Sequence, residues 1–334
     1  MALHGNHVTG NVFKRIKTSL PRETDPIPTL EGDLGVTVCG EALGLSKREP
    51  KACCKGRQDS VMAAAQPFQA KDHVELYEKY RFPPPEELQN VIFSYLEEKK
   101  GKPHRLAVDV GCGSGQGTRV LAPHFEWVLG MDISEAQIQQ ARQVPGPNNI
   151  SYRVCPAEDL PLEDASVDLV TAFAAAHWFD TERFLREVKR VLKPQGCVAL
   201  STYLPRMSLH FGDCSERLTQ IVEKQMQLLV DNYASNGIKF VLSEYKEILD
   251  AMTFPDKQRI RNLRGKMHMS VGELMGYIQS LAMYQKFLNI NPEAAKDSLK
   301  TTEESILETM GAHSKETQIE VWMNYVCILG YKMS

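Results

Sequence analysis

The chain has 334 residues, of which 24% are charged and 43% are hydrophobic, and it is long enough to bury one large core or two small ones. The formal net charge of −3 argues against strong electrostatic binding to nucleic acid or to an acidic membrane. No apolar run reaches the roughly 18 to 20 residues of a membrane span, and no apolar stretch typical of a secretory signal is found near the first residue.

The eight cysteines form no C-x-x-C pair, so a zinc knuckle or a thioredoxin-like redox site is not indicated. We therefore expect no metal. We also expect a reducing intracellular compartment, with the cytoplasm as the default location.

Residues 1–65 contain no Trp or Tyr and a single Phe. Such a segment buries too little apolar surface to offset the entropy of ordering it, so it is predicted to be a disordered N-terminal extension. A transit peptide, a lipidation site at Cys53-Cys54 and an alternative start at Met62 are the other interpretations. Residues 66–334 are predicted to form the folded domain.

Apolar periodicity becomes regular from about residue 70. A helix is expected after Pro83-Pro84-Pro85, with an apolar face that runs from Leu88 to Leu96. Short apolar segments then alternate with helical ones. The predicted strands are 106–110, 127–132, 150–154, 167–172 and 197–203, and the predicted helices are 118–122, 134–142 and 180–192. This alternation predicts βαβ units and a parallel sheet.

The pattern changes after residue 203. Helices are expected near 215–232, 243–252, 271–288 and 293–310, and strict alternation over 319–329 predicts a last strand. On the 271–288 helix, Tyr277, Ser280 and Tyr284 share a face, as pocket groups or as surface residues. Residues 206–315 are therefore predicted to be largely helical.

A glycine-rich loop, Gly111 to Gly117, follows the first predicted strand. Ligands bind at the carboxyl ends of such strands, and glycines let the backbone approach them. The dinucleotide fingerprint G-x-G-x-x-G fails, because its third glycine would fall on Gln116, Thr118 or Val120, and no Gly-Lys-Ser/Thr follows. A pyrophosphate ligand, and with it a dehydrogenase, is disfavoured.

Two carboxylates accompany this loop. Asp109 ends the first strand, and Asp132 ends the second strand 21 residues after Gly111, where an acid can accept both ribose hydroxyls of an adenosine. Separately, each has an ordinary explanation, as a loop cap and as a turn residue. Together they predict a nucleoside cofactor without phosphates, for which S-adenosylmethionine is the common example.

The chain resembles class I S-adenosylmethionine-dependent methyltransferases over nearly all of residues 70–334. The matching segments are 109–115, 130–134, 157–161, 167–170 and 190–196. The resemblance implies an α/β fold, Rossmann-like and doubly wound, with a mostly parallel seven-stranded sheet, an antiparallel last strand and a helical lid insertion. More narrowly, 116–118 and 175–180 resemble the trans-aconitate methyltransferase-like branch, which includes small-molecule carboxyl methyltransferases.

The resemblance also implies roles for individual residues. Gly111, Gly113 and Gly115 would lie beside the methionine moiety, with Asp109 at the start of the loop. Asp132 would hold the ribose. The adenine would lie against Ile133, Ala157 and Glu158, and the sulfonium side would face Phe173 and Ala174. Pro156 stands where many members carry an Asp that contacts the adenine amino group, so Glu158 or backbone groups would make that contact here.

The acceptor side has several candidates. His177 is the candidate base or orienting group and Trp178 an apolar wall, although the pair could instead fill a strand–helix junction. Arg206 could bind a carboxylate acceptor through its planar fork, beside Tyr203. Further candidates are Tyr80 and Arg81 from the N-terminal stretch, which closes over the cofactor in the resembled branch, and Tyr277 from the lid. Arg81 could equally pair with the cofactor's own carboxylate or lie in water.

The predicted function is methyl transfer from S-adenosylmethionine to a small-molecule acceptor. The resemblance to the trans-aconitate methyltransferase-like branch favours a carboxylate, whose methylation needs no base. The alternatives are a cofactor-binding protein without turnover and a methyltransferase for an amine, a thiol or a protein. Nucleic acid is disfavoured by the charge and by the missing Asn/Asp-Pro-Pro-Tyr/Phe signature after Ala172. No nucleic acid or membrane partner is expected.

Overall fold

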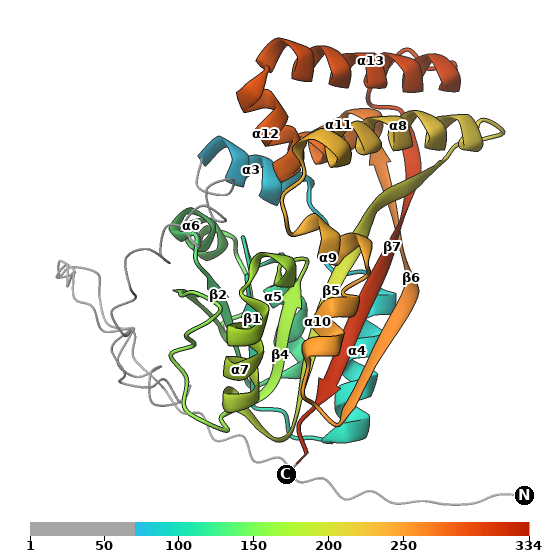
Figure 1. Ribbon diagram of the computed structural model, residues 1–334. Coiled ribbons are helices and arrows are strands. Elements are labelled where there is room, and N and C mark those ends of the chain that lie inside the picture. Colours follow the sequence, from blue (N-terminus) through green and yellow to red (C-terminus); the bar gives the residue numbers. More distant parts are fainter. Residues whose placement is uncertain (1–70, 334) are drawn as a thin grey trace, which may run out of the picture.

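The computed structural model describes residues 71–333 (Figure 1). The predicted N-terminal extension and the boundary at residue 66 lie outside the described residues. Within the described part, no helix is long and apolar enough to cross a membrane, and no group of three or more His, Cys, Asp or Glu side chains is arranged to hold a metal ion.

Seven strands form one sheet in the order β3-β2-β1-β4-β5-β7-β6. Neighbours from β3 to β5 pair in parallel, whereas β7 is antiparallel to both β5 and β6. The strands are β1 (Leu106–Val110), β2 (Trp127–Asp132), β3 (Ile150–Val154), β4 (Val167–Phe173), β5 (Leu192–His210), β6 (Asp256–Ser270) and β7 (Gln318–Tyr331). The doubly wound, mostly parallel sheet with an antiparallel last strand is thereby confirmed.

Helices cover both faces of the parallel strands, which is why all five residues of β1 are buried. Ala107 of β1 belongs to the core cluster that contains the apolar face of α4 (Glu86–Lys99), and Val108 belongs to the cluster that contains that of α7 (Thr181–Val191). Alternate residues of one strand therefore anchor opposite layers. In the described part of the chain, the other α-helices that precede β5 are α3 (Lys71–Tyr80), α5 (Gln116–Leu121) and α6 (Glu135–Gln143).

Two predicted helix starts are confirmed. The Ser134 hydroxyl accepts the Gln137 N–H at the start of α6, at 3.3 Å, and the Asp180 carboxylate accepts the Arg183 N–H at the start of α7, at 3.2 Å. Both caps lie just beyond the carboxyl ends of strands, so they place helix N-termini at the edge of the sheet where ligands bind.

Residues 206–315 hold α8 (Ser215–Tyr233), α9 (Ile238–Leu242), α10 (Lys246–Ala251), α11 (Val271–Gln279), α12 (Ala282–Ile290) and α13 (Pro292–Met310). In Figure 1, α8, α11, α12 and α13 gather at the far end of β5, β6 and β7, near α3. We call this group of helices the lid. The strands β5 and β7 extend well beyond the parallel half of the sheet and carry the lid at their ends.

Three local predictions need correction. The helical region also contains β6, a 15-residue strand. The helix expected over 271–288 is broken at Leu281, whose ψ of 133° is extended. The break coincides with Ser280, whose carbonyl oxygen accepts hydrogen bonds from the His73 and Arg81 side chains. Finally, Tyr77 and Tyr80 lie within α3, not ahead of the first helix.

Candidate active site

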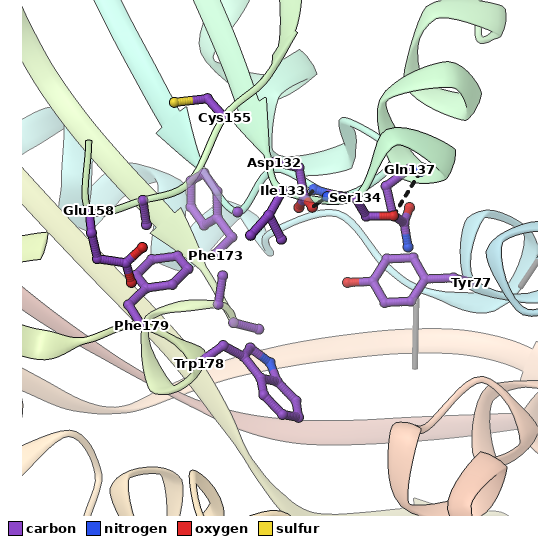
Figure 2. A pocket seen from close by; sticks show the side chains of 15 residues that line it. Tyr77, Asp132, Ile133, Ser134, Gln137, Cys155, Glu158, Phe173, Trp178 and Phe179 are labelled. Carbon is purple, nitrogen blue, oxygen red and sulfur yellow. Dashed lines mark hydrogen bonds between the residues drawn. The ribbon is translucent and has the colours of Figure 1, made fainter. Parts of the chain in front are cut away.

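A pocket of about 750 Å³ lies at the carboxyl ends of β1 to β4 (Figure 2). We call it the first chamber. It is lined by Tyr77, Gly111, Gly113, Asp132, Ile133, Ser134, Gln137, Cys155, Ala157, Glu158, Phe173, Ala174, Ala175, Trp178 and Phe179. The strand order reverses between β1 and β4, and the crevice at such a reversal is where open α/β sheets bind their ligands.

The loop after β1 depends on glycine. Gly111, Gly113 and Gly115 have φ values of +69°, +54° and +86°, a region that other residues rarely adopt. A Cβ on Gly111 would lie 2.5 Å from that of Ala175, whereas around Gly113 the nearest atom, on the Tyr77 ring, is 3.7 Å away. The backbone at Gly113 is therefore open toward the chamber, which permits a ligand to approach it closely.

Asp132 faces this chamber from the end of β2 (Figure 2). Its Oδ2 accepts the Gly113 N–H at 2.9 Å and its Oδ1 accepts the Ser134 N–H at 2.8 Å. Each carboxylate oxygen has a further lone pair, so two ligand hydroxyls can be bound at once. Burial raises the pKa of Asp132 above its ordinary value. Asp132 therefore remains the candidate acid for a ribose.

Asp109 is placed differently. It is 1% exposed, and its oxygens accept the hydroxyls of Thr171, at 2.8 Å, and Thr118, at 2.7 Å. These bonds connect β1 to β4 and to α5, which fixes the glycine loop at both ends. Burial raises the pKa of Asp109 to about 7.

The opposite side of the first chamber is apolar, apart from Glu158. Figure 2 shows Trp178 and Phe179 across the space from Asp132 and Ile133. Glu158 accepts the Asp180 N–H at 2.9 Å. The sequence analysis assigned Ser134, Gln137 and Phe179 no role in a pocket, although all three line the chamber. The signal that could have identified them is their position within six residues of the carboxyl ends of β2 and β4.

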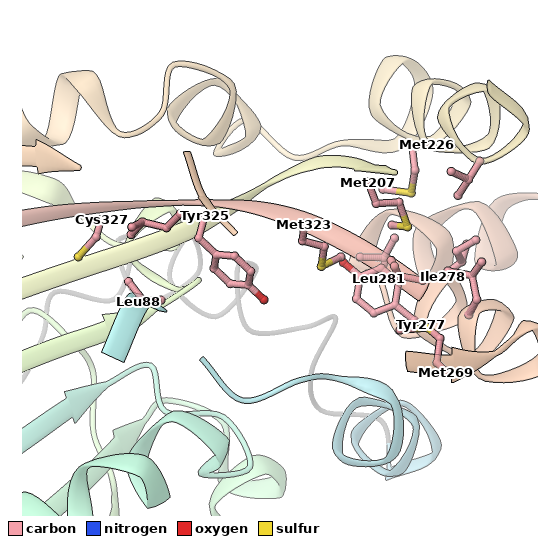
Figure 3. Close-up of a cluster of buried hydrophobic side chains, with 14 of the residues drawn as sticks. Leu88, Met207, Met226, Met269, Tyr277, Ile278, Leu281, Met323, Tyr325 and Cys327 are labelled. Carbon is pink, nitrogen blue, oxygen red and sulfur yellow. The ribbon is translucent and has the colours of Figure 1, made fainter. Parts of the chain in front are cut away.

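A second chamber, of about 630 Å³, adjoins the first. The two share Tyr77, Gly111, Phe173 and Ala174. The remaining lining residues are Arg81, Phe82, Pro84, Leu88, Asp109, Cys112, Gln116, Gly117, Ser201, Thr202, Tyr203, Tyr277, Met323 and Tyr325. Figure 3 shows Tyr277, Met323 and Tyr325 near one another beside the lid. A ligand in the first chamber would thus meet one in the second at Phe173 and Ala174.

The structure brings Arg81, Tyr203 and Tyr277 together in the second chamber and places Trp178 in the first. It does not bring Tyr80 or Arg206 to either one. The Tyr80 ring packs on the backbone of Gly276 in α11, and Arg206 is exposed on β5. Tyr284 packs between lid helices, where its hydroxyl lies 3.3 Å from the Ala295 carbonyl oxygen.

His177 lies in the short helical turn Ala176–Trp178 and lines neither chamber. Its Nδ1 is 2.8 Å from the Tyr245 hydroxyl. Burial, and secondarily the charge of Arg81, lowers the pKa of His177 to about 4. The imidazole is therefore neutral at pH 7 and a weak base. His177 is therefore placed as a residue that fills the strand–helix junction, whereas Trp178 lines the first chamber.

We expect His177→Gln to lower turnover by less than about tenfold, because a glutamine can keep a hydrogen bond to Tyr245 and only local packing is disturbed. The wild-type rate should be flat between about pH 6.5 and 8.5, since a group with a pKa near 4 does not titrate there. The measurement is turnover against pH for both proteins. A wild-type rate that rises through a pKa near the ordinary value of about 6.5, with a thousandfold loss in the variant, would make His177 the base.

Known methyltransferases are similar to this chain in sequence and in fold. A model of the methyltransferase domain family matches residues 108–200. A Dictyostelium discoideum protein named as a methyltransferase is 30% identical over 241 residues, which cover 72% of this chain and 86% of that protein. A Saccharomyces cerevisiae protein named as an S-adenosylmethionine-dependent methyltransferase is 32% identical over 152 residues, 41% of this chain and 52% of that one.

A solved structure from Anaeromyxobacter dehalogenans, described as a type II methyltransferase, superposes with a TM-score of 0.62 at 27% identity and covers 76% of this chain and 99% of that chain. Fold, glycine loop and relatives together define a class I S-adenosylmethionine-dependent methyltransferase. The chain belongs to this family and is an enzyme of this class.

Proposed function

We propose that this enzyme transfers a methyl group from S-adenosylmethionine to a carboxylate of a small molecule held in the second chamber. The observation that carries the proposal is the state of His177, the candidate base, which is partly buried, neutral and bonded to Tyr245. Asp109 does not replace it among the described residues, because both of its oxygens accept threonine hydroxyls. An acceptor that is already an anion at neutral pH suits such a site.

The first chamber fits the cofactor. Asp132 presents two free lone pairs, the Gly113 backbone is open, and the buried Gln137 Oε1 has no hydrogen-bond partner among the described residues. We assign the ribose to Asp132, the adenine to the side lined by Ile133, Ala157 and Glu158, and the reacting end to Phe173 and Ala174. The glycines at 111, 113 and 115 would border the methionine part, and Asp109 would hold that loop in place.

The chemistry then needs little from the protein beyond position. S-adenosylmethionine supplies an activated methyl group on a sulfonium. When bound, it would give this methyl group to a carboxylate oxygen held in the second chamber, and the electron pair of the broken carbon–sulfur bond would remain on sulfur. The products are a methyl ester and S-adenosylhomocysteine, and no proton moves. Holding the two reactants in line is the principal contribution of the residues around both chambers.

A small acceptor is supported by the lid, which supplies Tyr277 to the second chamber. The rest of that chamber is lined by residues within 77–88, 109–117 and 173–174 and by residues of β5 and β7. We therefore assign 206–315 as the acceptor region of a domain that spans 66–334. The trans-aconitate-like branch, whose members include carboxyl methyltransferases, is the subgroup that this proposal favours. A protein that binds the cofactor without turnover is the alternative.

The test is incubation with methyl-labelled S-adenosylmethionine and a fractionated small-molecule extract. The proposal predicts labelled products in the organic-acid fraction, with none from Asp132→Ala. Label confined to the amine, thiol or protein fractions would refute the carboxylate assignment. If the enzyme binds S-adenosylhomocysteine but forms no labelled product with an excess of the extract, the alternative without turnover would be favoured.

A further inference from the structure

Arg81 is a partly buried cation in the second chamber and has no counter-ion among residues 71–333. Its Nε donates to the Ser280 hydroxyl at 2.9 Å, its Nη2 donates to the Ser280 carbonyl at 3.1 Å, and its Nη1 donates to the Tyr203 hydroxyl. It forms no ion pair with any residue from 71 to 333. A cation taken out of water without a paired anion is costly to the fold.

The guanidinium also has unused donors. A guanidinium carries five N–H groups, and the three bonds to Ser280 and Tyr203 use one on each nitrogen. One N–H remains on each terminal nitrogen. Two such groups match the two oxygens of a carboxylate, which is the geometry of the strongest Arg–carboxylate pairs.

Phenols surround this cation. Its carbon Cζ lies 4.9 Å from the centre of the Tyr77 ring and 5.2 Å from that of Tyr277. Burial raises the pKa of Tyr77 to about 12, and it raises those of Tyr277 and Tyr325 as well. These hydroxyls therefore stay protonated at neutral pH. Tyr325, which lines the same chamber as Arg81, can donate its hydroxyl proton to an anion bound there.

We propose that Arg81, together with the Tyr325 hydroxyl in the same chamber, binds the carboxylate of the methyl acceptor, and that the acceptor is a carboxylic acid with an apolar body. The proposal deepens the proposed function and rests on it. Phe82, Leu88 and Met323 supply apolar surface in the same chamber, so an anion at Arg81 would carry a hydrocarbon or aromatic part against them.

The cofactor's own carboxylate is the other source of such an anion. The acceptor is favoured because Arg81 lines the second chamber and not the first. Its partners also come from the acceptor side, since Ser280 lies between the lid helices α11 and α12 and Tyr203 lies on β5. The lid thus positions the residue that would recognise the acceptor.

The first experiment uses full-length protein saturated with S-adenosylhomocysteine and titrates 3-phenylpropionate and octanoate by calorimetry, with the corresponding primary amides as neutral probes. We expect at least one acid to bind, and its amide to bind at least tenfold more weakly. Arg81→Met should weaken the acid by about 30-fold or more and Arg81→Lys by less, because lysine keeps the charge and loses the fork.

Arg105→Met is the matched control, since Arg105 is an exposed arginine paired with Glu126, and it should leave acid binding unchanged. Tyr325→Phe, which removes one phenol and keeps the ring, should weaken the acid severalfold and serves if Arg81→Met does not fold. Failure of both acids to bind the wild type, equal binding of acid and amide, or acid binding unchanged in the Arg81 variants would overturn the proposal.

A second arm separates the two sources of the carboxylate. S-adenosylhomocysteine carries the amino-acid carboxylate and 5′-methylthioadenosine lacks it. We expect Arg81→Met to bind both as the wild type does. A tenfold loss for S-adenosylhomocysteine alone would assign Arg81 to the cofactor and refute the proposal. Methyl esters formed with an unchanged KM in Arg81→Met would refute this inference while leaving the proposed function intact.

Discussion

Asp132→Ala is expected to weaken S-adenosylhomocysteine binding by about 30- to 1000-fold, equivalent to roughly 2–4 kcal/mol for two lost charge-assisted hydrogen bonds. The Asp132 carboxylate lies beside the glycine loop in the first chamber and can bind a diol through its two oxygens, and its Oδ2 also accepts the Gly113 N–H of the loop. The loss of the contacts to the diol and the loss of the contact to the loop both weaken cofactor binding. Calorimetry with S-adenosylhomocysteine measures the change.

Two further variants serve as controls for this result. Asp213→Ala removes an exposed carboxylate on the connection between β5 and α8 and should leave the affinity unchanged. Asp132→Asn keeps the shape of the side chain, yet its amide can accept through one oxygen only, so an intermediate loss is expected. A folded Asp132→Ala protein with wild-type affinity would show that the cofactor is not bound at this acid.

Asp168→Ala is expected to reduce the free energy of unfolding by about 3–5 kcal/mol, the usual cost of removing one partner from a buried ionic cluster. Asp168 is 1% exposed. Its Oδ2 accepts the N–H groups of Arg105 and Leu106 and the Lys193 ammonium, each at 2.9 Å, and its Oδ1 lies 3.2 Å from the Lys100 ammonium. The carboxylate therefore joins the starts of β1, β4 and β5.

These partners outweigh burial and lower the pKa of Asp168 below its ordinary value. A group whose pKa is lowered by folding stabilises the fold above its unfolded pKa, here about 4, and loses that contribution as the pH falls further. Urea unfolding near neutral pH is the measurement, with Asp250→Ala, which breaks an exposed pair with Lys246, as a control of little effect. An Asp168→Ala protein with nearly the wild-type free energy of unfolding would contradict the assigned role.

The parallel half of the sheet was predictable because its signals are local. Strands buried on both faces appear as apolar runs, and Ser134 and Asp180 mark helix starts within their own turns. The strand β6 gave no such signal. It lies at the sheet edge with basic residues at Lys257, Arg259 and Arg261, and what makes it a strand is pairing with β7, whose register joins residues such as Asp256 and Tyr331 that are far apart in the sequence.

In the candidate site, too, the residues with local signals could be predicted and those that depend on distant contacts could not. Asp132 and the glycines could be found from sequence because strand ends meet at one edge of a parallel sheet. The surroundings of Arg81 depend on Ser280, 199 positions away, and those of His177 depend on Tyr245, 68 positions away. Contacts between residues so far apart leave no periodic pattern in the sequence. The sequence therefore left three roles open for Arg81 and made His177 a candidate base.

The carboxylate assignment is tested most directly by the chemical stability of the transferred methyl group. Enzyme, methyl-labelled S-adenosylmethionine and the organic-acid fraction are incubated, and the products are then treated with mild base. A methyl ester hydrolyses to volatile methanol, whereas a methyl group on nitrogen, on a thioether sulfur or on carbon does not. We predict that most of the transferred label becomes volatile. Label that stays on the product after base treatment would contradict carboxylate methylation.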